Sequence, residues 1–175
     1  QRQMCIRDSF LTWFSISEGF LNVGYYSRAN SLLIIGTVIA SSVGPLLYSK
    51  WSLVKGKELK LQVRRVSLLL AFVNTLLAIG LIIFAPIFIR ILYGTEYQTA
   101  APVLRLLALT MIANGAKEVS YGILSSQGSP LSIMKNLVIG IILSAILNYF
   151  IIPQFGVIGC SVVTVLVTFT TAFLL

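Results

Sequence analysis

The chain alternates between long apolar runs and short charged segments. Residues 29–49, 66–89 and 136–175 contain no charged residue, and these runs are 21, 24 and 40 residues long. A helix needs about 20 apolar residues to cross the hydrocarbon core of a bilayer, so each of the first two runs predicts one membrane span. The third run is long enough for two spans, and the sequence PQFG at 153–156 interrupts it.

One further stretch, residues 101–125, is mostly apolar but contains Arg105, Lys117 and Glu118. We expect it to be a span with polar content and not a loop. Residues 10–20 are a candidate for the end of an earlier span. The pattern therefore predicts five spans, at residues 29–49, 66–89, 101–125, 132–152 and 157–175.

These runs predict an all-α integral membrane protein, a polytopic bundle of about five to six transmembrane helices. Strands are disfavoured because the runs are about twice the length of a barrel strand and lack alternation with a period of two. The composition agrees, since 57% of the residues are hydrophobic, 10% are charged and the mean hydropathy is +0.94. A soluble domain carries about 25% charged residues.

Basic residues cluster in the segments between the predicted spans. Residues 50–65 hold six of the 13 Lys and Arg residues, and Lys135 follows the short segment 126–131. Arg90 is the one basic residue in the segments on the opposite side. Cytoplasmic loops carry an excess of Lys and Arg, so we expect 50–65 and 126–131 to be cytoplasmic. The net charge is +8, but the basic residues are gathered in segments between spans and are not spread over a face that could bind nucleic acid. We therefore expect no nucleic-acid partner.

The 101–125 stretch places its polar residues on one helical face. Counted from Thr110 as i, these residues lie at i, i+4, i+7, i+8, i+11 and i+15, a spacing that puts them on one side of a helix. A Lys and a Glu facing lipid would cost at least a few kcal/mol each, so we expect both to face the bundle interior or a wet cavity. Either this face lines a cavity for a polar or charged solute, or a Lys–Glu pair fixes the packing. The residues are Thr110, Asn114, Lys117, Glu118, Tyr121 and Ser125.

Every other predicted span also has a stripe of small or polar residues. Asn136, Gly140, Ser144 and Asn148, for example, follow one another at intervals of four. Small residues allow close helix packing in membranes, so packing alone can explain each stripe. Arg28 lies at the outer edge of its span, where it could reach the headgroups or turn inward to meet an anionic group.

Catalytic and metal-binding motifs are absent from the sequence. It contains no His, and its two cysteines, Cys5 and Cys160, form no cluster. No H-E-x-x-H, G-x-S-x-G or glycine-rich phosphate loop is present. We therefore expect neither an enzyme nor a cofactor or metal site.

Several segments resemble the C-terminal half of the bacterial polysaccharide flippases, which export lipid-linked O-antigen and capsule repeat units. The matching segments are VGYYSRANSLL (23–33), LYGTEYQTAAPVLRLLAL (92–109), GILSSQGSPLS (122–132) and LNYFIIPQFGVIGCSVVTV (147–165). These flippases belong to the multidrug/oligosaccharidyl-lipid/polysaccharide exporter superfamily.

The resemblance implies that residues 10–175 are a polysaccharide biosynthesis C-terminal-type membrane domain. It would form most of one lobe of about six helices, around a cavity shared with an N-terminal lobe of the same chain. It also implies alternating access, a bacterial inner-membrane location and a lipid-linked oligosaccharide substrate. Such a substrate carries anionic phosphate, with which Arg28, Arg105 and Lys117 could pair. Asn114, Glu118 and Tyr121 complete the candidate cavity residues.

Three alternatives remain open at this stage. The first two are a multidrug cation exporter and a lipid II flippase of the same superfamily. A cation exporter favours acidic cavity residues, and Glu118 is the one acid in the predicted spans. The third is a scaffold without transport activity in a glycan assembly complex, in which the polar faces would be helix contacts only.

Residues 1–9, QRQMCIRDS, differ in character from all that follows. They begin with Gln and lack the apolar region of a signal peptide. They resemble the translation of a sequencing adapter, and the last apolar run continues to Leu175. We therefore expect residues 1–9 to be an artefact and the domain to be truncated at both ends. Alternating access needs both lobes, so we expect no transport by these 175 residues alone.

Overall fold

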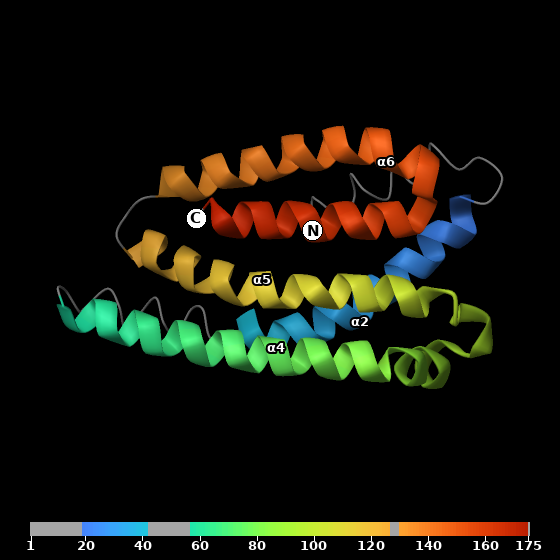
Figure 1. The fold of residues 1–175 in the computed structure, drawn as a ribbon, viewed down its shortest axis with the longest axis horizontal. Coiled ribbons are helices and arrows are strands. Elements are labelled where there is room, and N and C mark those ends of the chain that lie inside the picture. The colour runs from blue at the N-terminus through green and yellow to red at the C-terminus, as the bar shows by residue number, and fades with distance from the viewer. Residues whose placement is uncertain (1–18, 42–56, 127–129, 175) are drawn as a thin grey trace.

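The computed structural model describes residues 19–41, 57–126 and 130–174. In these ranges the chain forms four α-helices and one 3₁₀ turn, and no strand. Figure 1 shows the helices lying along one common direction as a bundle. The elements are α2 (Gly19–Ser41), α4 (Lys57–Tyr93), η1 (Thr95–Tyr97), α5 (Ala100–Ser126) and α6 (Pro130–Phe173). The expected artefact at 1–9 lies outside the described residues.

Two helices begin well before the apolar runs that predict them. In the described part of the chain α2 begins at Gly19, whereas the predicted span begins at residue 29. The helix α4 begins at Lys57, so the predicted loop 50–65 is helical from residue 57 onward. Its first turns consist of good helix formers, Lys, Glu, Leu, Gln and Arg. Hydropathy identifies the part of a helix that can lie in the hydrocarbon core of a membrane. It does not identify the residue at which the helix begins.

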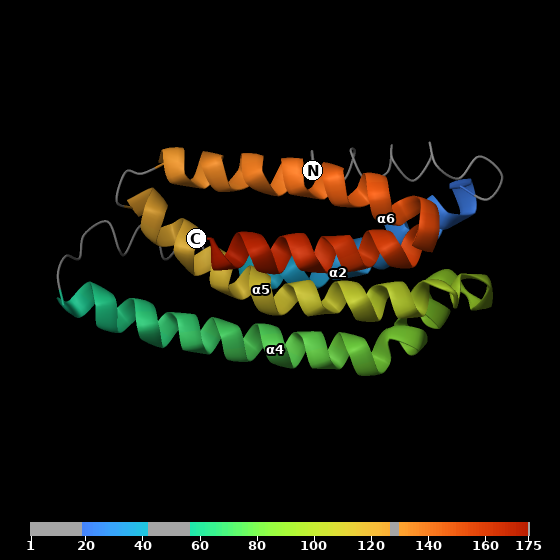
Figure 2. The same ribbon diagram turned by 45° about the horizontal axis from the view of Figure 1, so that its top comes forward.

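The helix α6 folds back on itself at the PQFG sequence. Gly156 has φ 53° and ψ −131°, which is not helical, and Pro153 lies three residues before it. Pro153 lacks the N–H that would continue the helix, and glycine tolerates a positive φ that other residues resist. Figures 1 and 2 show two arms, 130–155 and 157–173, that run side by side in opposite directions. The bend lies where the sequence predicts a break.

The central helix is α5, which packs against α2, α4 and α6. Large side chains of α5, such as Leu104, Leu107 and Met111, are fully buried in the main core. The helix α5 comes close to α4 at Gly115, where an added Cβ would lie 2.7 Å from the Asn74 Nδ2 atom. The predicted span 101–125 and the helix 100–126 thus nearly coincide, and both neighbours of α5 in sequence pack against it.

The stripes of small and polar residues lie in the bundle interior. In the first arm of α6, Asn136, Gly140, Ser144 and Asn148 are all buried. In the second arm, the buried Thr164 hydroxyl donates to the Cys160 carbonyl oxygen at 2.8 Å. Hydroxyls that are bonded within their own helix allow close packing without an unpaired donor. Burial of these stripes therefore allows the helices to pack closely.

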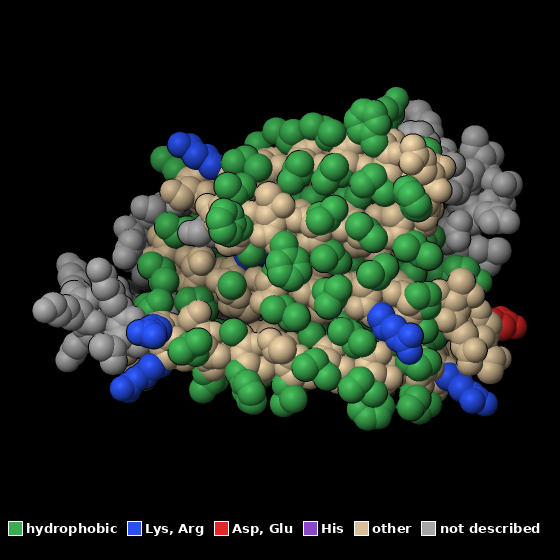
Figure 3. All heavy atoms as spheres, in the orientation of Figure 1, with side chains coloured by type: hydrophobic (Ala, Val, Ile, Leu, Met, Phe, Trp, Pro, Cys, Tyr) green, Lys and Arg blue, Asp and Glu red, His purple; other side chains and the backbone are tan. Residues whose placement is uncertain are grey.

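Large apolar side chains cover much of the outside of the described bundle. Phe72, Leu131 and Phe150, for example, are each between 65% and 70% exposed. Figure 3 shows hydrophobic side chains across the middle of one face, with Lys and Arg side chains at its left end and also toward its right end. In Figure 1 the left end holds the start of α4, the end of α5 and the start of α6. The exposed basic residues in these segments include Arg64, Arg65 and Lys135.

Two described helices are long and apolar enough to cross a membrane. They are residues 62–93 of α4 and residues 131–173 of α6, and the second contains both arms. The helix α5 falls below this apolarity because it carries three charged residues, and α2 carries Arg28 and several polar residues. The structure therefore does not confirm the predicted number of five to six spans.

Candidate functional site

The polar residues of α5 lie partly inside the bundle, as the helical spacing predicts. Thr110 is buried, and its hydroxyl donates to the Leu107 carbonyl oxygen at 2.6 Å. Asn114, Lys117 and Glu118 are half-buried, and so is Tyr121. Ser125, near the end of the helix, is exposed. The middle of this face thus offers an amide, an ammonium, a carboxylate and a phenol within about two helical turns.

Lys117 connects α5 to both arms of α6. Its Nζ donates to the Thr171 Oγ1 atom at 3.0 Å, and Thr171 lies in the second arm. The Thr171 carbonyl oxygen accepts a hydrogen bond from the Asn136 Nδ2 atom of the first arm at 2.9 Å. We call these three residues the Lys117 network. Sequence reasoning placed Asn136 in a stripe but did not pair it with Lys117 or Thr171, because a sequence does not show which stripes face each other.

The Lys117 network combines a charge with an incompletely satisfied amide. The ammonium of Lys117 also lies 5.9 Å from the centroid of the Tyr121 ring, within the range of a cation–π contact. Asn136 is 5% exposed, and within the described ranges its Oδ1 atom has no hydrogen-bond partner. Polar atoms buried without a partner cost free energy, and they are found where a ligand or a water completes the site. This arrangement can attract an anionic group at Lys117 and accept a hydrogen bond at the Asn136 Oδ1 atom.

Arg105 faces a different neighbour from Lys117. The Arg105 side chain is exposed, and its Nε donates to the Ile82 carbonyl oxygen of α4 at 3.2 Å. Twelve residues separate Arg105 from Lys117, which is about 18 Å along a helix and about 120° around it. The two cations therefore do not converge on one small group. The sequence suggested a shared role because both residues lie in one span.

Arg28 lies at the η1 end of the bundle, apart from the Lys117 network. Its guanidinium carbon is 5.2 Å from the centroid of the Tyr93 ring. Tyr93 and Tyr25 each pack against Tyr97, with ring centroids 6.1 Å and 5.8 Å apart. Sequence reasoning missed this tyrosine cluster (Tyr25, Tyr93 and Tyr97), although YYSR precedes the first apolar run and LYGTEY follows the second. Tyrosines gather at membrane–water interfaces, which fits this end of the bundle.

The described residues contain no group of three His, Cys, Asp or Glu side chains that could hold a metal ion. Within them Glu118 is the one acid inside a long helix at membrane depth, and Glu96 lies in the exposed η1 turn. The chemistry of the site is therefore that of a cation, one carboxylate, amides and a phenol.

Comparison with known proteins identifies relatives for most of the chain. The MatE family profile matches residues 25–150. The uncharacterized membrane protein MJ1068 of Methanocaldococcus jannaschii is 31% identical over 145 residues, which is 81% of this chain and 29% of that protein. The Probable low-salt glycan biosynthesis flippase Agl15 of Haloferax volcanii is 26% identical over 149 residues, which is 83% of this chain and 32% of that protein.

The chain thus spans about a third of the length of these two curated relatives. No solved structure matches it significantly. The family profile covers α5, most of α2, α4 and the first arm of α6, which together contain Arg28, Arg105 and Lys117. With its apolar helices and its match to a membrane protein, the chain is part of a multi-pass membrane protein. It belongs to the MatE family, within the exporter superfamily that includes the glycan flippases.

Proposed function

We propose that the protein to which this chain belongs flips a lipid-linked oligosaccharide across the bacterial inner membrane by alternating access. In this proposal the chain supplies most of one lobe, and a second lobe of the same protein supplies the rest of the cavity. Two lobes around a site near the bilayer midplane are the usual arrangement in transporters that are built from repeats.

The observation that carries this proposal is the position of Lys117. It lies four residues from the centre of α5, and its ammonium is held by Thr171 beside the ring of Tyr121. A cation at this depth is costly unless the protein uses it. An anionic phosphate of a lipid-linked glycan would be a natural partner, because charge-assisted hydrogen bonds to phosphate are strong.

The comparisons and motifs support the glycan as the substrate class. One relative is named a glycan biosynthesis flippase, and the family profile covers most of the chain. The four motif segments resemble polysaccharide flippases in the same order along the chain. This combination favours transport of a lipid-linked glycan over a scaffold role.

We assign different parts of this task to different residues. Lys117 attracts the phosphate, while Asn114 and Tyr121 offer hydrogen bonds to sugar hydroxyls on the same helical face. Glu118 adds a carboxylate that can accept bonds from those hydroxyls. Arg105 lies closer to the η1 end than Lys117 does, and there it would meet an anionic group as it leaves the cavity.

A flipping assay on the full-length protein in vesicles tests the proposal. We expect the double variant Lys117→Ala and Arg105→Ala to lose most of its activity toward a fluorescent polyprenyl-pyrophosphate glycan. Unchanged flipping by the double variant would overturn the site assignment. Failure of the wild-type protein to move this glycan would overturn the substrate class.

A second candidate function is export of organic cations, and Glu118 favours it. This carboxylate is half-buried on the same face of α5 and would attract a cation. Lys117 is its neighbour in sequence and opposes that attraction, so we prefer the anionic substrate. Export of a dye such as ethidium by cells that express the full-length protein, together with its loss in Glu118→Gln, would reverse this preference.

A further inference from the structure

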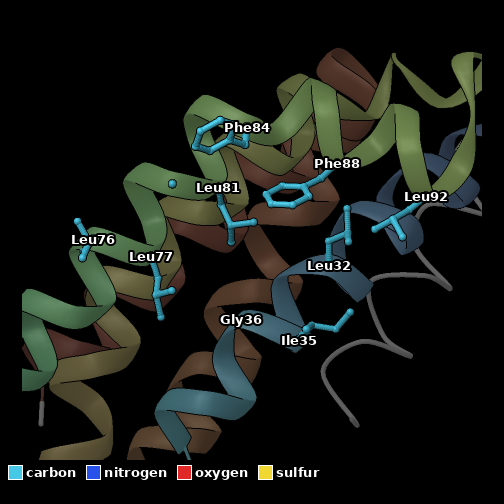
Figure 4. A pocket seen from close by; sticks show the side chains of 10 residues that line it. Leu32, Ile35, Gly36, Leu76, Leu77, Leu81, Phe84, Phe88 and Leu92 are labelled. Carbon is cyan, nitrogen blue, oxygen red and sulfur yellow. The ribbon is translucent and has the colours of Figure 1, made fainter.

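A narrow apolar groove runs between α2 and α4. Its volume is about 360 Å³, and all ten residues that line it are apolar or glycine. Figure 4 shows side chains from both helices, including Leu32, Phe84, Phe88 and Leu92, pointing into the space where the helices diverge. The lining of α4 extends over 16 residues, from 76 to 92, which is about 24 Å of helix.

Gly80 of α4 widens this groove, because an added Cβ there would have no atom within 4 Å. Gly36 of α2 also lines the groove, but an added Cβ there would lie 3.1 Å from the Met111 Cε atom. Several lining residues are also exposed, among them Ile35 at 64% and Leu92 at 57%. The groove is therefore open along its length and has room that side chains do not fill.

One end of the groove carries a positive charge. Arg28 lies one turn before Leu32 on the same face of α2, and the i, i+4 spacing brings their side chains together. Its guanidinium packs on the ring of Tyr93, which directly follows Leu92. Among the residues that the structure describes, no Asp or Glu forms an ion pair with Arg28. The groove thus combines an apolar channel with an uncompensated cation at its η1 end.

The length and the lining of the groove suit a hydrocarbon chain. The part of α4 that lines the groove is about 24 Å long, and the lining is apolar along this length. A hydrocarbon chain is about 4 Å wide, as set by contact distances between carbon atoms. A volume of about 360 Å³ leaves room for such a chain between the two helices.

We propose that this groove holds a membrane lipid, with one hydrocarbon chain between α2 and α4 and its phosphate at Arg28. The apolar lining disfavours a polar occupant, and the cation at one end favours an anionic group at one end of the hydrocarbon chain. This site lies apart from the Lys117 network, and it does not depend on the proposed glycan transport. A lipid bound here would bridge the two helices where they diverge.

Titration of the purified full-length protein with two lipids tests the proposal. The probes are dioleoyl phosphatidic acid and dioleoylglycerol, which share their chains and differ in the phosphate. Native mass spectrometry gives the affinity of each. We expect phosphatidic acid to bind about tenfold more tightly, as expected for a hydrogen-bonded charge. Equal affinities for the two lipids would overturn the role of Arg28.

Matched variants separate the contribution of the lipid headgroup to binding from that of its hydrocarbon chain. Arg28→Gln should remove the preference for phosphatidic acid. Arg90→Gln should keep it, because Arg90 is an exposed cation at the same end of α4 but lies about 160° around the helix from Leu92. Gly80→Leu should weaken binding of both lipids by filling the groove. Ile79→Phe, which adds bulk outside the groove, should not.

The two remaining outcomes also decide the matter. If the Gly80→Leu variant binds both lipids as tightly as the wild type does, the hydrocarbon chain of the lipid lies elsewhere. The groove then receives another part of the protein. If Gly80→Leu does not fold, phosphatidic acid with a photoreactive group in its chain replaces it. Crosslinks to α2 and α4 support the site, and crosslinks confined to α6 overturn it. Neither result depends on whether the protein flips a glycan.

Discussion

The Lys117 ammonium of α5 donates to the Thr171 hydroxyl of α6 across 3.0 Å. Thr171 can accept this bond because its own hydroxyl hydrogen points back to the Val167 carbonyl oxygen, at 2.8 Å. A hydroxyl that is already bonded within its helix thereby supplies a partner to a charge on a neighbouring helix. This contact links the most polar helix of the bundle to the hairpin that follows it.

Loss of the Thr171 hydroxyl should destabilise the protein more than loss of Lys117. Thr171→Val removes an acceptor from a buried charge, and we expect a cost of about 1–3 kcal/mol in the free energy of unfolding. Lys117→Met removes the charge itself and leaves Thr171 bonded to Val167, so we expect little change. Thermal unfolding in detergent measures both. Thr171→Ser is the control that keeps the hydroxyl, and a greater loss in Lys117→Met than in Thr171→Val would contradict this account.

The contact between Gly115 and Asn74 should behave as a coupled pair. Gly115→Ala places a Cβ 2.7 Å from the Asn74 Nδ2 atom, and overpacking of this kind costs about 1–3 kcal/mol. We expect Gly115→Ala to be neutral or stabilising in an Asn74→Ala background, because the obstructing amide is then gone. A double-mutant cycle on unfolding free energies measures the coupling. Equal effects of Gly115→Ala in both backgrounds would show that the helices do not meet at these residues.

The bend in α6 should depend on Gly156 through its backbone alone. An added Cβ at Gly156 meets no atom within 4 Å, so the cost of Gly156→Ala arises from its φ of +53°. We expect a loss of about 1–3 kcal/mol. Gly80→Ala is the matched control, since Gly80 is helical and its Cβ also meets open space, and it should stabilise by up to about 1 kcal/mol. A Gly156→Ala protein as stable as the wild type would mean that this turn is not strained.

The bond between α2 and the second arm of α6 should contribute little. The Tyr26 hydroxyl lies 3.3 Å from Thr164 Oγ1, which itself donates to Cys160, so Tyr26 is the donor. Hydrogen bonds between membrane helices average about 0.6 kcal/mol, and we expect Tyr26→Phe to cost about that much. Tyr26→Ala should cost several times more, because it also empties a fully buried position in the core. A similar cost for both variants would make the hydroxyl, and not the ring, the main contribution.

Hydropathy predicted the helical character of the chain and the break at PQFG, but it misplaced two helix starts. The reason is visible in α4, where charged residues from Lys57 to Arg65 continue the helix beyond the apolar run. Periodicity predicted that Asn136, Ser144 and Asn148 face inward, and all three are buried. A stripe of polar residues describes one face of one helix. It identifies neither the helix that packs against this face nor the distance between the two helices.

The candidate site was also predicted only in part, because helical spacing describes one helix and not its neighbours. Helical spacing grouped Asn114, Lys117, Glu118 and Tyr121, and all four are half-buried on α5. It could not reveal that Arg105 turns to α4 and Arg28 to Tyr93, because those contacts join segments that are distant in sequence. The groove between α2 and α4 was missed because it is a gap between two helices and has no sequence pattern of its own.

The rate of glycan flipping by a Lys117→Met variant of the full-length protein tests the central claim most directly. Lys117→Arg and Lys135→Met are the controls. The first keeps the charge at the site, and the second removes an exposed charge from the start of α6. We predict that Lys117→Met lowers the flipping rate at least about tenfold, as expected for loss of one charge-assisted bond to phosphate, while its thermal stability is unchanged. Flipping by Lys117→Met at the wild-type rate would contradict the claim that this lysine meets the substrate.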